Sequence, residues 1–260
     1  GQYRARVAAS GPREVRELGG AFNEMADEIE RARGSEHAFL ADISHELRTP
    51  LTSIGGFAQA IAEGEVKGEG VGWAANVIRR ESRRLARLVE GLLQVARLQA
   101  GTLLMTREPV ALERVLYGAI AALEVQAHDA GVALEPDLPS LPPVHGDVDR
   151  LAQLFLNVLD NAVRHSPAGS AVAVRAAAED GEVVVRVRDH GSGLPEGAET
   201  RLFERFYRGE NAADGGAGLG LAIAQAIAHG HGGRIHAQNV AGGGAEFSVH
   251  LPTGGPANVR

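Results

Sequence analysis

A histidine, a glutamate and a threonine lie within five residues of one another in the segment FLADISHELRTPLTSI, residues 39–54. Ile43 and Leu47 are four apart, the spacing of one face of a helix, and His45 lies two residues from each, about 200° around the helix. We therefore expect His45 to face solvent. An imidazole has a pKa near 6.5, so much of it is neutral at pH 7 and offers a ring nitrogen as a nucleophile.

The residues after His45 favour a functional site over an ordinary surface histidine. Thr49 is one helical turn further on, so its hydroxyl is expected on the same face as the imidazole. Pro50 has no N–H to donate to the carbonyl of Glu46 and its ring crowds that carbonyl, which predicts a kink. Glu46 itself lies on a different face from His45, so it must bend its side chain to act on the ring.

A second group of residues with chemical potential lies in the C-terminal half. Asn157 and Asn161 are four apart at the edge of an apolar helical stripe, and the segments DHGSGLP (189–195), LFERFYRG (202–209) and GGAGLGLAIA (215–224) follow. Glycines let the backbone turn tightly, and bare amides at a helix N-terminus hold phosphate oxygens. Each motif alone is weak evidence, because solvated amides and flexible glycine loops are common.

Apolar periodicity predicts the elements that position these residues. Helical spacing recurs in 12–33, 43–61 and 85–95, interrupted by the Gly/Glu-rich stretch 64–72, which indicates an antiparallel helical hairpin. A lone hairpin cannot enclose a core, so we expect a homodimeric four-helix bundle. Beyond Gly101, strands at 171–177 and 182–189 and helices at 112–130, 147–165 and 219–229 predict a separate α+β domain.

Composition narrows the function classes. The 260 residues are 44% hydrophobic, carry a formal net charge of −7 and include no cysteine, which excludes disulfides and thiolate metal sites and argues against nucleic-acid binding. Lys67 is the sole lysine, so arginine must serve where lysine is usual. No apolar run reaches bilayer length and no signal peptide opens the chain, so we expect a soluble fragment of a longer protein.

The segment around His45 resembles the phosphoacceptor motif of sensor histidine kinases in two-component signalling. The resemblance implies that His45 takes the γ-phosphoryl group of ATP and that Glu46 acts as base or orients the ring. It also implies that Thr49 positions water when a phosphorylated partner is dephosphorylated. The partner would be the receiver domain of a response regulator.

Residues 146–251 resemble the ATP-binding domain of the same kinases, an α+β sandwich shared with gyrase, mismatch-repair and heat-shock chaperone ATPases. The resemblance implies that Asn161 binds Mg²⁺, that Asn157 lies beside the phosphates and that Asp189 accepts from the adenine amine. These roles suit the chemistry, because Mg²⁺ prefers oxygen ligands and a carboxylate only accepts hydrogen bonds. The other positions assigned to the nucleotide site are Arg164, His165, Gly191, Gly193, Phe203, Phe206, Gly216, Gly218, Leu219 and Gly220.

The chain departs from the family pattern at three places. Arg164 and His165 stand where lysine and tyrosine are frequent, although a guanidinium still suits phosphate. Ala245 stands where threonine is frequent, and the lid between Tyr207 and Gly216 is short. An arginine cluster in the second hairpin helix is interpreted as a solvated face, in preference to a docking surface for an acidic receiver domain. His229 and His231 are too sparse for a metal site.

Residues 1–33 resemble the second helix of a HAMP linker, which implies a cytoplasmic fragment of a parent protein anchored in the plasma membrane by upstream segments. We therefore predict three domains: 1–33 HAMP-like helix, 34–100 dimerisation and phosphotransfer, and 101–260 ATP binding. Two alternatives remain open at this point. The chain could be a dimeric ATP-driven clamp of the wider ATPase class, or a scaffold that binds ATP and a partner without transfer.

Overall fold

The computed structural model describes residues 7, 12–99, 106–207 and 218–254. They divide into two compact units, one ending at Leu85 and the other beginning at Ala86. No helix in this described part is long and apolar enough to cross a membrane. The domain limits inferred from the sequence remain predictions, and Gly101 lies outside the described residues.

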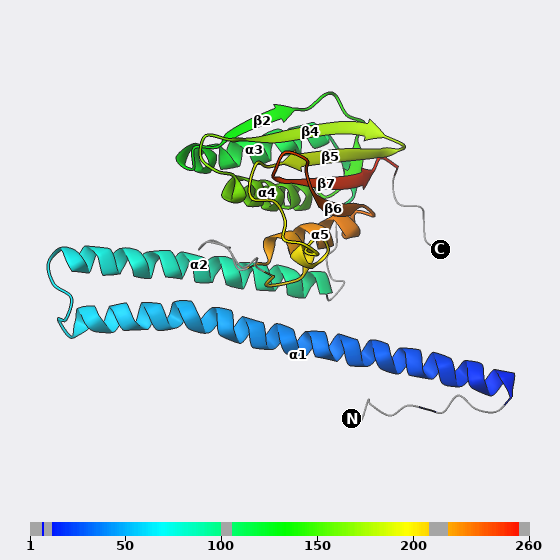
Figure 1. The fold of residues 1–260 in the computed structure, drawn as a ribbon, viewed down its shortest axis with the longest axis horizontal. Coiled ribbons are helices and arrows are strands. Elements are labelled where there is room, and N and C mark those ends of the chain that lie inside the picture. The colour runs from blue at the N-terminus through cyan, green and yellow to red at the C-terminus, as the bar shows by residue number, and fades with distance from the viewer. Residues whose placement is uncertain (1–6, 8–11, 100–105, 208–217, 255–260) are drawn as a thin grey trace. The chain divides into compact units, whose positions relative to one another are not determined.

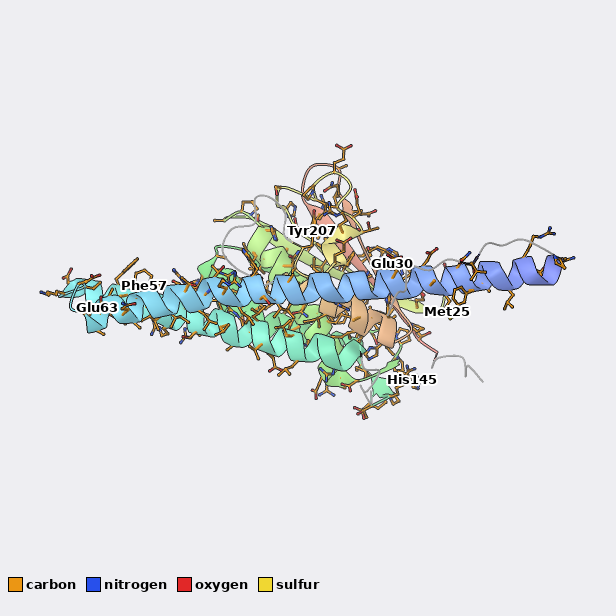
Figure 2. The ribbon with its side chains drawn as sticks, turned by 90° about the horizontal axis from the view of Figure 1, so that it is seen from below. Met25, Glu30, Phe57, Glu63, His145 and Tyr207 are labelled. Atoms are coloured by element: carbon orange, nitrogen blue, oxygen red, sulfur yellow. The ribbon has the colours of Figure 1, made fainter. Side chains whose placement is uncertain are left out.

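Two long helices build the first unit. Helix α1 spans Arg13–Ala62, and helix α2 spans Glu69–Gln99 and continues beyond the limit of the unit. The chain reverses between them at Gly64 and Gly68, which have positive φ angles of 73° and 58°. The two helices form the expected antiparallel hairpin (Figure 1). Phe57 and Glu63 lie near the connection, and Met25 and Glu30 lie far from it along α1 (Figure 2).

The helices differ in extent from the sequence prediction. The patterns in 12–33 and 43–61 belong to one continuous helix, because the single Gly34 between them costs only about 1 kcal/mol in a helix. Gly70 and Gly72 lie inside α2, so the break is shorter than the predicted 64–72. The helix α1 also runs through Pro50, and the kink there stays a prediction.

The hairpin has a thin core. Ala74 and Val77 are buried, and the rings of Phe57 and Trp73 pack edge to face with centroids 5.1 Å apart, yet Trp73 remains 61% exposed. Other large apolar side chains of α1 are also exposed: Leu18, Phe22, Met25 and Leu51. One copy of the hairpin therefore leaves much of its apolar surface uncovered.

The second unit contains a five-stranded mixed sheet of order β2-β4-β5-β7-β6. Its strands are β2 (Ala133–Asp137), β4 (Ala171–Glu179), β5 (Glu182–Arg188), β6 (Arg234–Asn239) and β7 (Ala245–Pro252). Strand β2 is parallel to β4, and the other neighbours are antiparallel. A separate two-stranded sheet pairs β1 (Glu108–Val110) with β3 (Val144–Gly146).

Helices cover one face of the large sheet (Figure 1). They are α3 (Leu112–Asp129), α4 (Val148–His165) and α5 (Gly220–Gly230), with a short 3₁₀ helix η1 at Arg201–Phe203. Alternate residues of β7 are buried against this layer, among them Phe247 and Val249. The apolar stripe of α4 is wholly buried on the same side. The α+β domain predicted from the sequence is confirmed, with helix and strand limits shifted by a residue or two.

Candidate functional site

The imidazole of His45 is exposed on α1, as its spacing predicts, while Ile43 and Leu47 are half-buried. Thr49 is exposed one turn further on, and its hydroxyl donates to the carbonyl oxygen of His45 at 3.4 Å. Pro50 is buried. An imidazole ring and a hydroxyl therefore share one solvent-facing side of α1, and the hydroxyl donates to the backbone of its own helix in this conformation.

Glu46 turns away from His45 toward α2. Its Oε2 accepts from Nη2 of Arg84 at 3.2 Å, and the two side chains are only 22% and 23% exposed. Glu81 supports the same guanidinium at 3.9 Å. The arginine cluster of α2, which includes Arg84, was interpreted from the sequence as a solvated face, and that interpretation missed this contact. The sequence does not reveal which arginine of this cluster faces α1.

Helix α4 carries the two asparagines beside its buried stripe. It begins with Asp147, whose side chain accepts from the Arg150 amide at 3.1 Å as an N-cap. Asn157 and Asn161 are half-buried one turn apart. Among the described residues, Nδ2 of Asn157 is buried without a hydrogen-bond partner. An orphaned buried donor is costly in isolation, so this amide is suited to an acceptor on a bound ligand.

Asp189 follows β5 and joins two distant backbone segments. It is 2% exposed, and its Oδ1 accepts from the amides of Gly191 at 2.9 Å and Ala245 at 3.0 Å. Its own amide donates to the Ala245 carbonyl oxygen at 2.9 Å. Within the described structure Oδ2 has no such donor, so one carboxylate oxygen organises the loop and the other remains available as an acceptor.

Close backbone packing explains two of the glycines near Asp189. A Cβ on Gly191 would overlap the carbonyl oxygen of His165, and one on Gly244 would overlap that of Asp189. The C-terminal end of α4 and the β6–β7 turn thus both press on this loop. His165 has an exposed side chain, and Arg164 pairs with Asp160 at 2.8 Å, one turn earlier on α4.

Two short segments meet at the base of the region assigned to the lid. The Phe206 amide donates to the Gly218 carbonyl oxygen at 2.9 Å, and both residues have positive φ, 61° and 66°. A Cβ on Gly218 would lie 2.7 Å from the Phe206 carbonyl carbon, so only glycine fits there. Phe203 is buried in η1, and Leu219 is the buried N-cap of α5. Gly216 lies outside the described residues.

The start of α5 lies against α4. An ideal Cβ on Gly220 would be 3.6 Å from Oδ1 of Asn157. The orphaned amide of Asn157 is therefore close to the first residue of α5, where backbone N–H groups are unpaired in any helix. The structure thus brings together Asn157 and Gly220, the first residue of α5, and separately joins Asp189 to Gly191.

His231 is a buried histidine that ties α5 to α4. Its Nδ1 donates to the Ile227 carbonyl oxygen at 2.8 Å, and its Nε2 accepts from the Asp147 amide at 3.0 Å. Burial lowers the pKa of His231 below 6.5, which matches a neutral ring. No group of three potential metal-binding His, Asp or Glu side chains occurs in the part of the chain that the structure describes.

Comparison with known proteins accounts for nearly the whole chain. Family models match the HAMP domain over residues 1–31, the His Kinase A (phospho-acceptor) domain over 35–101, and the Histidine kinase-, DNA gyrase B-, and HSP90-like ATPase over 146–255. The signal transduction histidine-protein kinase BaeS of Escherichia coli K12 is 36% identical over 255 residues, which cover 97% of this chain and 54% of BaeS. The chain thus spans about half the length of the curated relatives it matches.

Solved structures of histidine kinases are similar as well. Acinetobacter baumannii AdeS matches with a TM-score of 0.68 and 27% identity, covering 80% of this chain and 98% of that one. Full-length ShkA in complex with AMPPNP matches with a TM-score of 0.62 and 32% identity, covering 83% of this chain and 45% of ShkA. The order of the three matched domains and the identity of these relatives show that the chain belongs to the sensor histidine kinases of two-component systems.

Proposed function

We propose that this chain transfers the γ-phosphoryl group of ATP to His45 and then to an aspartate on the receiver domain of a response regulator. The observation that carries the proposal is the exposed imidazole of His45 on a helix whose chain also contains a nucleotide-type site around Asp189 and Asn157. Membership of the family supports the same reaction.

Nucleotide binding rests on three features of the second unit. The free carboxylate oxygen of Asp189 accepts from the adenine amine, which favours adenine over guanine because guanine presents a carbonyl at that position. The orphaned amide of Asn157 donates to a phosphate oxygen. The amides at the start of α5 lie close to it and add the positive end of the helix dipole.

A magnesium ion would be held by the amide oxygen of Asn161, one turn beyond Asn157, together with the phosphates and water. A neutral ligand suffices because the triphosphate already supplies negative charge. When bound, the ion offsets charge on the transferring phosphoryl group.

The chemistry at His45 is a displacement at phosphorus. A neutral ring nitrogen forms a bond to the γ-phosphorus while the bond to the β–γ bridging oxygen breaks, and ADP leaves. The proton on the other ring nitrogen passes to Glu46. Because Glu46 pairs with Arg84 in this conformation, it must exchange that partner for the imidazole when transfer occurs. Thr49 is not needed in this step and instead orients water during dephosphorylation of the regulator.

Dimerisation completes the hairpin in this proposal. Leu51 and Trp73 are exposed, and a second copy that forms a four-helix bundle would cover such side chains. The HAMP match supports a parent protein anchored in a membrane by segments outside this chain, with this part in the cytoplasm. The limits 1–33, 34–100 and 101–260 are part of the same proposal.

Incubation with γ-labelled ATP tests the reaction. Acid-labile, base-stable label on the protein, lost in His45→Ala and in Asn161→Ala, supports the kinase. His128→Ala is the matched control, because His128 is a highly exposed histidine of α3 with a side chain 90% exposed. Release of free phosphate alone would instead support the clamp ATPase, and neither label nor phosphate would support the scaffold. Label that persists in His45→Ala would overturn the assignment of the nucleophile.

A further inference from the structure

The last residue of β6, Asn239, makes two hydrogen bonds to one backbone position of the loop after Asp189. Its Oδ1 accepts from the Leu194 amide at 2.6 Å, and its Nδ2 donates to the Leu194 carbonyl oxygen at 3.0 Å. The two residues are 45 apart in sequence. A single side-chain amide thus satisfies both backbone groups of a loop residue that belongs to no strand or helix.

The side-chain amide of Asn239 also packs closely against Gly193. Gly193 has a positive φ of 76°, and an ideal Cβ on it would lie 2.6 Å from Oδ1 of Asn239. The loop therefore follows the amide closely, and any larger residue at Gly193 would displace it. Asp189 secures the start of the loop through the Gly191 amide at 2.9 Å, so the loop is held at two points.

The two anchored residues, Gly191 and Leu194, lie at the two ends of a loop that follows Asp189, the residue proposed to recognise the base. A loop with glycines at 191 and 193 loses much conformational entropy when it becomes ordered. If only Asp189 held it, the segment up to Leu194 would populate other conformations, and nucleotide binding would have to select one of them. Asn239 removes that requirement before the nucleotide arrives.

We propose that Asn239 is a positioning residue that preorganises the loop 191–194 for the adenine base, an inference that rests on the proposed function. It does not touch the transferring phosphoryl group, so its loss weakens nucleotide binding and leaves the rate at saturating ATP nearly unchanged. The sequence offered no signal for this role, because an asparagine at the end of a strand usually serves the following turn.

The size of the effect follows from the two bonds. Each of the two hydrogen bonds favours the ordered conformation of the loop. When only a fraction of the molecules hold the loop in the conformation that binds nucleotide, the apparent affinity for nucleotide falls in proportion to that fraction. We expect Asn239→Ala to weaken AMPPNP binding roughly tenfold, which corresponds to about 1.4 kcal/mol. The KM for ATP should rise by a similar factor while kcat stays within about twofold.

Gln238→Ala is the matched control. Gln238 precedes Asn239 on β6, but its amide reaches only Glu246, at 3.2 Å, on the neighbouring strand. This variant should keep the AMPPNP affinity of the wild type. Asn239→Asp is a second test variant, because it keeps an acceptor for the Leu194 amide and loses the donor to the Leu194 carbonyl. It should also bind AMPPNP more weakly.

The experiment uses the full chain and combines AMPPNP titration with hydrogen exchange in the absence of nucleotide. The expected result is weaker binding together with faster exchange of the Leu194 amide, while exchange in β4 and β5 is unchanged. AMPPNP affinity within twofold of wild type, even with a lower Tm, would overturn the proposal, because Asn239 would then only stabilise the β6–β7 hairpin. Failure of the wild type to bind AMPPNP would instead overturn the nucleotide site itself, and Leu194 exchange would still report on the amide contact.

Discussion

Asp189→Asn separates the structural role of this side chain from its proposed role in recognising adenine. The hydrogen bonds from the amides of Gly191 and Ala245, at 2.9 and 3.0 Å, both go to Oδ1. An asparagine with its oxygen in that place keeps both bonds and puts an NH₂ group where Oδ2 was. The variant should therefore fold but present a donor to the base.

Asp189→Asn should lower the stability of the fold only slightly but weaken ATP binding strongly. A neutral acceptor weakens two bonds by about 1–2 kcal/mol in total. Removing a buried charge from a side chain that is 2% exposed offsets part of that loss. The Tm should therefore fall by no more than about 4 °C. For ATP, loss of a charged hydrogen bond removes about 1.5–3 kcal/mol, and two facing donors add a further ~1–3 kcal/mol. A total of about 3 kcal/mol, near the lower end of that range, weakens binding about 150-fold.

Calorimetric titration with AMPPNP and GMPPNP measures the change. Adenine affinity should fall steeply while guanine affinity should rise, because the introduced NH₂ can donate to the guanine carbonyl. Asp137→Asn, at an exposed aspartate on the edge strand β2, is the control and should bind both as the wild type does. If Asp189→Asn bound AMPPNP within threefold of wild type at an unchanged Tm, Asp189 would not contact the adenine amine.

Three further predictions test other parts of the site. Thr49→Ala should keep His45 labelling within about fivefold, a shift of about 1 kcal/mol, and lose most regulator dephosphorylation; equal loss in both assays would make Thr49 structural. Gly218→Ala should weaken AMPPNP binding at least tenfold by crowding Phe206. Gly197→Ala is the control and should not weaken binding, because Gly197 has a similar φ of 71° but open space around it. Equal effects of the two variants would mean that the backbone angle alone is responsible. Burial lowers the pKa of His231, so the unfolded chain binds the proton first as pH falls. The free energy of unfolding should therefore decline below about pH 6.5 by up to ~1.4 kcal/mol per unit, and a denaturant series that shows the same slope for His231→Gln would contradict this.

Local patterns in the sequence were enough to predict the main helices, several strands and the exposure of part of the site. Helical spacing places His45 on the solvent side of α1, because the direction of a side chain on a helix depends only on its position in the repeat. The same periodicity places Asn157 and Asn161 beside the buried stripe of α4. It did not reveal that α1 is continuous, since two separate apolar patterns look the same whether the intervening residues are helical or not.

Contacts between distant residues were decided only by the tertiary structure. Glu46 pairs with Arg84 across 38 positions, and periodicity could not choose among neighbouring arginines because long side chains reach several partners. Asp189 meets the Ala245 amide across 56 positions, and Asn239 meets Leu194 across 45. These pairings depend on which strands lie side by side and on close approaches of one backbone to another, such as that of Gly244 to Asp189. Residue type and local spacing therefore determined which groups the chain could use, whereas close packing of segments far apart in sequence determined which of them meet.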